Sequence, residues 1–232
     1  MTAPATSRQR ILERIAAATH ALSKTATELP AAYAALPRTY IRKGQLSPEA
    51  RIELMIERLR EYDAEVVQCT EEQLPETITA QLAASGRLIL VAPPGIPSAW
   101  MIDAAWKITG LEWNIDHGLT TREIEQAEGV VTTAFCGIAD SGTIVLHHSP
   151  LEGRRVISLL PDWHLCILRF SQVVETFPEY FDRCDQPPGL ATWISGPSAT
   201  ADIEMTRIKG VHGPRYLHVI LVRDHDANTT VN

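Results

Sequence analysis

The sequence lacks the short cysteine spacings from which iron–sulfur and structural zinc sites usually draw their ligands. Its four cysteines are Cys69, Cys136, Cys166 and Cys184, and no two of them form a CxxC pair. Each lies in or beside an apolar run, so we expect buried thiols that stay reduced. The chain is therefore expected to hold neither a metal ion nor a cofactor of its own.

Long apolar runs and basic clusters are also missing. No segment approaches the length of a membrane span, and residues 1–10 lack the apolar stretch of a signal peptide. We therefore expect a cytoplasmic protein. The net charge is −7, from 28 acidic and 21 basic residues, and the basic residues form only short groups such as Arg154 with Arg155. Nucleic-acid binding, which needs a basic surface, is not expected.

What is present is typical of a globular domain. Of 232 residues, 45% are hydrophobic and 21% are charged, enough to bury a core without disulfides. Apolar periodicity predicts helices over residues 8–29, 48–62, 71–84, 97–109 and 171–182. Strands are predicted over residues 64–69, 87–92, 112–116, 130–136, 143–148, 156–160, 165–170, 191–195 and 217–222.

Local signals set several of these boundaries. Ser47 precedes a proline and can cap the second helix, Pro30 ends the first one, and Ser171 can cap the last one. Thr120 and Glu123 fit a capping box. The alternation of strands and helices before residue 129 predicts a parallel sheet, and the closely spaced strands after it favour antiparallel pairs. We predict a mixed α/β domain over residues 47–232 with a helical arm over residues 1–46.

The first of three candidate ligand-binding segments is the turn at residues 137–143. Gly142 allows a sharp turn, and such turns present backbone N–H groups to ligands, here from Ser141, Gly142 and Thr143. Asp140 could act as an acid, a base or a hydrogen-bond acceptor. An ordinary β-turn needs the same residue types, and on spacing alone that alternative is favoured.

The second segment, residues 195–204, follows a predicted strand and could open a helix near Ser198 or Thr200. Free N–H groups at a helix start bind anions, and ligands gather at the carboxyl ends of parallel strands. A capped helix start without a ligand is an equal alternative. The candidate residues are Gly196, Pro197, Ser198, Thr200 and Asp202 for ligand binding and Glu204 for catalysis.

The third segment, residues 210–215, is a tight turn before the last strand. A lone histidine is more often structural, but its place in a tight turn favours a functional role, and His212 could be a general acid or base, with Gly213 beside the ligand. His164 is a weaker candidate, and the adjacent His147 and His148 would point to opposite faces of a strand. We expect the three segments to meet in one cleft. Their donors and hydroxyls suit a small anionic ligand better than a metal.

Together these segments resemble the LUD domain, and within it the lactate utilization protein C family. The resemblance is carried by residues 139–143, 159–161, 196–204, 210–214 and 217–222. It covers residues 120–222 well. The N-terminal half resembles the family in its first helix and in its alternation of helices and strands. It implies a Rossmann-like mixed sheet similar to the NagB/RpiA/CoA-transferase group. One position departs from the family pattern Gly-Pro-Ser-Arg-Thr, because Ala199 occupies the place of the arginine.

The resemblance also implies a function, namely a part in the oxidation of L-lactate to pyruvate within a complex whose partner subunits carry iron–sulfur clusters. The scattered cysteines agree with such a division of labour. The alternative is an independent CoA or acyl transferase, or a nucleotide-dependent ligase, of the same fold group. No dinucleotide-binding glycine motif follows a predicted strand, and metalloprotease, hydrolase and P-loop motifs are missing too. The sequence therefore leaves open whether this chain is itself an enzyme.

Overall fold

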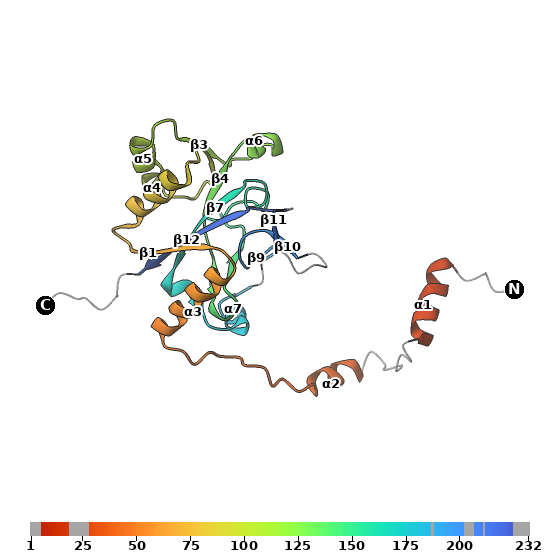
Figure 1. Cartoon of the computed structure of the whole chain (residues 1–232). Coiled ribbons are helices and arrows are strands. Elements are labelled where there is room, and N and C mark those ends of the chain that lie inside the picture. Colours follow the sequence, from red (N-terminus) through yellow and green to blue (C-terminus); the bar gives the residue numbers. More distant parts are fainter. Residues whose placement is uncertain (1–5, 19–27, 187, 202–206, 211, 225–232) are drawn as a thin grey trace. The chain divides into compact units, whose positions relative to one another are not determined.

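The computed structural model describes residues 6–18, 28–186, 188–201, 207–210 and 212–224. The chain divides into two units, residues 1–40 and residues 41–232. The first unit holds helices α1 (Ser7–Ala18) and α2 (Glu28–Ala34) (Figure 1). The sequence predicted that Pro30 ends a helix, and this prediction is wrong. Pro30 lies in the first turn of α2, where the missing N–H has no helical partner to lose.

A six-stranded parallel sheet forms the centre of the second unit. Its strands follow the order β1-β12-β7-β4-β2-β3, with parallel neighbours throughout. The last strand of the chain therefore lies in the interior of the sheet, and the predicted Rossmann-like mixed α/β fold is confirmed. The strands are β1 (Glu65–Thr70), β2 (Ile89–Ala92), β3 (Glu112–Ile115), β4 (Gly129–Thr133), β7 (Trp163–Arg169) and β12 (Tyr216–Arg223).

Helices cover both faces of this sheet. Figure 1 shows α3 (Pro48–Glu61) on one side of β1 and β12, and α4 (Leu74–Ser85) with α5 (Ser98–Lys107) on the other. The side chains of β12 alternate between these layers. Val219 and Leu221 join the core beneath α3, whereas Ile220 and Val222 join the core beneath α4. Ser47 caps α3 as predicted, by accepting a hydrogen bond from the N–H of Ala50.

A smaller sheet packs on the α3 side of the large one, through Ile144 and Leu146. Its strands are β5 (Cys136–Ile138), β6 (Thr143–Leu146), β8 (Val173–Val174) and β9 (Thr192–Ile194), in the order β8-β5-β6-β9. The 3₁₀ helix η1 (Ala139–Ser141) joins β5 to β6. The remaining elements are α6 (Thr121–Glu125), η2 (Phe170–Gln172), α7 (Phe177–Asp182) and a hairpin of β10 (Ala199–Ala201) and β11 (Arg207–Lys209).

Several element predictions are confirmed and others are wrong. The capping box of Thr120 and Glu123 starts α6. Residues 156–160 form turns rather than a strand, because Val156, Ile157 and Leu160 pack against α6 and β4 while their backbone makes local hydrogen bonds. Ser171 caps no long helix, since the residues after it pair with β5 as β8 and α7 starts only after Thr176.

Two further predictions about residues 191–201 are corrected by the structure. Strand β9 is antiparallel to β6 in the small sheet, so its carboxyl end is not an edge of the parallel sheet. No helix opens at Ser198 or Thr200, because Thr200 lies within β10 and pairs with Ile208 of β11. Over the described ranges, no helix is both long and apolar enough to cross a membrane.

The turn after η1 gives a test of how closely it packs on α3. Gly142 has a φ of 60°, and a Cβ there would lie 2.9 Å from the carbonyl carbon of Arg58. Gly86 has a φ of 67° but nothing within 4 Å. We predict that Gly86→Ala costs about 1–2 kcal/mol of unfolding free energy for left-handed backbone. Gly142→Ala should cost at least about 1 kcal/mol more, because the helix backbone cannot move aside.

Urea unfolding of the two alanine variants and the parent chain measures this difference, provided that the slopes agree. Equal losses for both variants would contradict the close packing of the turn on α3.

Candidate functional site

Two of the three candidate segments line one cavity of about 140 Å³. Its walls come from the loop that follows β9, the turn that precedes β12, and the turn that contains Arg155 and Ser158. His164 and Leu217 also line it. These two residues are register partners near the starts of β7 and β12. The cavity therefore lies at the amino ends of two central parallel strands.

Backbone contacts hold two of the walls together. The N–H of Ser198 donates to the carbonyl of Pro214 over 2.8 Å, and the N–H of Gly210 donates to the carbonyl of Ser198 over 2.9 Å. The Ser198 hydroxyl donates to the carbonyl of His212. Gly213 has a φ of 104°, and an added Cβ would lie 3.6 Å from Ser198 Cβ. The sequence had assigned Ser198 to a ligand, but its hydroxyl joins the two loops.

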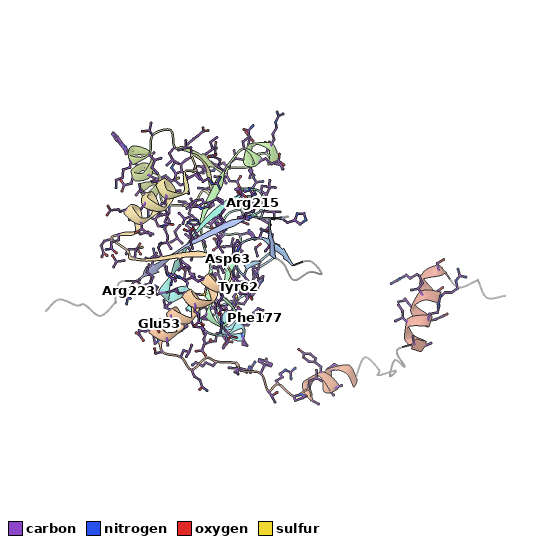
Figure 2. The ribbon with its side chains drawn as sticks, in the orientation of Figure 1. Glu53, Tyr62, Asp63, Phe177, Arg215 and Arg223 are labelled. Carbon is purple, nitrogen blue, oxygen red and sulfur yellow. The ribbon has the colours of Figure 1, made fainter. Side chains whose placement is uncertain are left out.

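The loop after β9 also rests on the end of α3. Figure 2 marks Tyr62 and Asp63 at this end. A Cβ on Gly196 would lie 2.5 Å from Tyr62 Cβ, and Gly196 has a φ of 83°, so this position requires glycine. Pro197 lines the cavity beside it. Glycine and proline at these positions therefore fix the path of the wall.

The first candidate segment reaches the cavity through a chain of hydroxyl groups. Ser141 Oγ lies 2.7 Å from Thr143 Oγ1, which lies 2.7 Å from Ser195 Oγ in the cavity wall. Asp140 is exposed and outside the lining, and its N–H donates to the carbonyl of Glu175. Its charge adds weakly to the effect of Glu61 in raising the pKa of Arg58. The structure thus places Asp140 over α3.

The remaining predicted residues are placed as follows. His212 is exposed at the cavity rim, next to Gly213. Gly142 packs on α3, away from the lining, and Thr200 belongs to β10. Asp202 and Glu204 lie outside the described residues.

Three lining residues received little or no weight in the sequence analysis, and their environment explains their importance. Arg155 Nη1 donates to Ser158, over 3.3 Å to the carbonyl and 3.1 Å to Oγ. Burial lowers the pKa of Arg155, although a guanidinium stays charged at neutral pH. The described lining residues include no carboxylate and no lysine. The described lining therefore carries a positive charge, which favours an anion.

His164 is the third of these residues, and it is fully buried on β7. Its Nε2 lies 2.8 Å from Thr132 Oγ1. Burial, and secondarily the charge of Arg155, lower its pKa to about 4, so the ring is neutral at physiological pH. A histidine in an otherwise apolar strand is usually a core residue, and the sequence alone offers no signal that this one borders a cavity.

Of the adjacent histidines after β6, His148 contacts a residue of the cavity lining and His147 contacts residues outside it. His147 Nε2 lies 2.8 Å from the Tyr180 hydroxyl, and its ring stacks on Phe135. His148 Nε2 lies 2.8 Å from Thr192 Oγ1, which lines the cavity. The two rings thus have separate partners. The described part of the chain has no group of three or more His, Cys, Asp or Glu side chains placed to bind a metal.

A larger cavity of about 470 Å³ lies at the carboxyl ends of β1 and β12, against α3. Several of its polar groups have partners within the protein. Arg51 Nη1 donates to the carbonyl of Val173, Arg223 lies over the Phe170 ring, and Asp224 accepts from the N–H of Ser171. No described residue of the three candidate segments contributes to it. We therefore take the smaller cavity as the candidate site.

Known proteins share this fold and much of this sequence. A protein of Deinococcus radiodurans named Lactate utilization protein C is 36% identical over 186 residues, which cover 76% of this chain and 82% of the relative. Its counterpart of the same name in Exiguobacterium is 31% identical over 203 residues, or 83% and 86% of the two chains. The Bacillus subtilis protein of that name is 38% identical over 121 residues, half of its length.

A solved structure is also similar to this chain. The crystal structure of a DUF162 family protein from Deinococcus radiodurans has a TM-score of 0.61 and 31% sequence identity to this chain. The match covers 77% of this chain and 99% of that one. Residues 52–222, which include the parallel sheet and every described residue of the cavity lining, match the model of the LUD domain. The chain belongs to the LUD domain family.

Proposed function

We propose that this chain takes part in the utilization of lactate and that the cavity at the starts of β7 and β12 binds a small anionic ligand in that process. The names of the relatives support the first part, since three of them are called Lactate utilization protein C. The charge of the cavity supports the second. Its described lining joins the Arg155 guanidinium to hydroxyl and imidazole groups, with no carboxylate to oppose an anion.

The size of the cavity favours a small ligand over a large one. A volume of about 140 Å³ exceeds the needs of a single water and lies below the roughly 300–1,000 Å³ of pockets for drug-sized molecules. Lactate and pyruvate are three-carbon carboxylates and suit this size. Coenzyme A and nucleotides, the ligands of the alternative transferase or ligase function, are far larger. Among the predicted catalytic residues, His212 lines this cavity, and we keep it as the candidate acid or base.

The chain acts, in this proposal, in the cytoplasm as a subunit of a lactate-oxidising complex, with iron–sulfur clusters in the partner subunits. The raised pKa values of its cysteine thiols support the placement of the clusters in partner subunits. Burial raises the pKa of Cys136 to about 11 and that of Cys166 to about 12, and it also raises the pKa of Cys69. A cluster needs thiolate ligands, and such thiols are poor sources of them.

Replacing Arg155 tests the anion site. We expect Arg155→Gln to weaken binding of L-lactate or pyruvate by about 10-fold or more, because hydrogen bonds to charged groups are the stronger class. Titration calorimetry on the purified chain at constant ionic strength measures the change. The exposed Arg122 of α6 provides the matched control, and Arg122→Gln should bind as the parent does. Unchanged affinity in Arg155→Gln would rule out this cavity as the anion site.

Metal content and activity test the proposal that the redox centres lie in partner subunits and not in this chain. After anaerobic reconstitution with iron and sulfide, the purified chain should hold no stoichiometric iron and should not oxidise L-lactate with a dye acceptor. A hydride or electron pair needs an acceptor group, which the partner subunits would supply. Iron analysis, absorbance and a dye-reduction assay are the measurements. A stoichiometric cluster, or turnover by the isolated chain, would contradict the assignment of the redox centres to partners.

A further inference from the structure

The side chain of His164 leaves a polar atom buried and unpartnered beside the cavity. The residue is 1% exposed and lines the cavity near the start of β7. Its Nε2 is used by Thr132, but its Nδ1 has no hydrogen-bond partner among the described residues. A buried polar atom without a partner is costly, so such an atom beside a cavity points to a ligand that satisfies it.

Unlike His164 Nδ1, the hydroxyl groups around it have hydrogen-bond partners within the protein. Ser158 Oγ donates to the carbonyl of Arg155, and Ser198 Oγ donates to the carbonyl of His212. Thr192 and Ser195 have partners in His148 and Thr143. Each of these hydroxyl groups therefore has a partner within the walls. Of the buried side-chain polar atoms in the described lining, His164 Nδ1 is the one left for a ligand.

A ligand beside Nδ1 decides which nitrogen of His164 carries the proton. Thr132 Oγ1 lies 2.8 Å from His164 Nε2 and 4.0 Å from Cys166 Sγ. The Thr132 hydroxyl can donate to Nε2 or accept from it, so both tautomers of the neutral ring fit this contact. A carboxylate oxygen accepts hydrogen bonds only, so its approach to Nδ1 selects the tautomer that carries the proton on Nδ1, and Thr132 then donates to Nε2.

We infer that His164 is a ligand-contacting residue whose Nδ1–H donates to a carboxylate oxygen of a small monocarboxylate, with Arg155 supplying the balancing charge. This inference rests on the anion-binding function proposed above and names its substrate class. A monoanion matches the single guanidinium of the described lining. A dianion such as phosphate would leave one charge unbalanced in a partly desolvated site, which is unfavourable. The neutral donor adds direction to the bond without adding charge.

Two substitutions separate the two nitrogens of the ring. In His164→Gln, the side-chain amide lies near the position of Nε2, so the Thr132 contact is kept and the donor beside the cavity is lost. In His164→Asn, the amide lies near Nδ1 and that donor is kept. The exposed His117, which follows β3 at the far edge of the sheet, provides the control His117→Gln. Calorimetry at pH 8, where inorganic phosphate is mainly a dianion, measures binding of L-lactate, pyruvate, acetate and phosphate to each full-length variant at constant ionic strength.

We expect the parent chain and His117→Gln to bind a carboxylate probe more tightly than phosphate. His164→Gln should lose about 10- to 100-fold in affinity, the range for a hydrogen bond to a charged group. His164→Asn should stay within a few-fold of the parent. Parent-like affinity in His164→Gln would overturn the inference and leave the anion site intact. Tighter binding of phosphate would overturn the monocarboxylate class, and no binding by the parent chain would overturn the proposed function as well.

A measurement on the parent chain keeps the inference testable if either variant fails to fold. With ¹⁵N-labelled histidine, NMR distinguishes a protonated ring nitrogen from an unprotonated one. On saturation with the carboxylate, we expect the Nδ1 resonance of His164 to move and to be that of a protonated nitrogen. A proton on Nε2, or unchanged His164 resonances at saturation, would contradict the contact.

Discussion

The arrangement of this domain depends on the placement of β12 between β1 and β7. This last strand forms parallel ladders with both neighbours, so its backbone groups are paired on two sides. Its side chains from Leu217 to Val222 are buried on both faces. The neighbour β1 comes from the N-terminal part of the domain, and the neighbour β7 comes from its middle. The two parts of the sheet are therefore joined only when β12 pairs with both.

The same placement builds the candidate site. Because β12 runs parallel to β7, the residues that lead into the two strands lie side by side, and Leu217 becomes the partner of His164. An ion pair fixes this alignment from outside the cavity. Arg215, marked in Figure 2, donates from Nη2 to Asp162 over 2.9 Å, one residue before the start of each strand. The turn of His212 then has little freedom except to lie over the start of β7.

Sequence patterns predicted much of the fold because local signals and burial agree there. Ser47 and Thr120 cap the helices they were expected to cap, and the apolar run of β12 matches a strand buried on both faces. The predictions were wrong where tertiary contacts decide the structure. The apolar residues at 156–160 pack as turns, and the segment after Ser198 finds a hairpin partner in β11 that no local pattern reveals.

The candidate site was likewise predictable from the sequence only where local backbone properties decide the structure. Turn-forming residues predicted turns at Gly196 and Gly213, and both have a positive φ, which is a local property. His164 was named only as a weaker candidate than His212, and Arg155 was not named as a site residue. One lies within an apolar strand and the other beside a second arginine, and only the packing of the small sheet on the large one turns both toward the same cavity. Convergence of distant residues is a property of topology, which periodicity does not encode.

The departure at Ala199 fits the charge of this cavity. The family pattern places an arginine after Ser198, whereas Ala199 lies exposed at the start of β10. Arg155 reaches the cavity from a different segment and is held there by Ser158, independently of the hairpin. Ala199 is not among the described lining residues, and it adds no charge beside Ser198. With alanine at this position, the described lining keeps one guanidinium and a neutral His164, and one carboxylate group balances that charge.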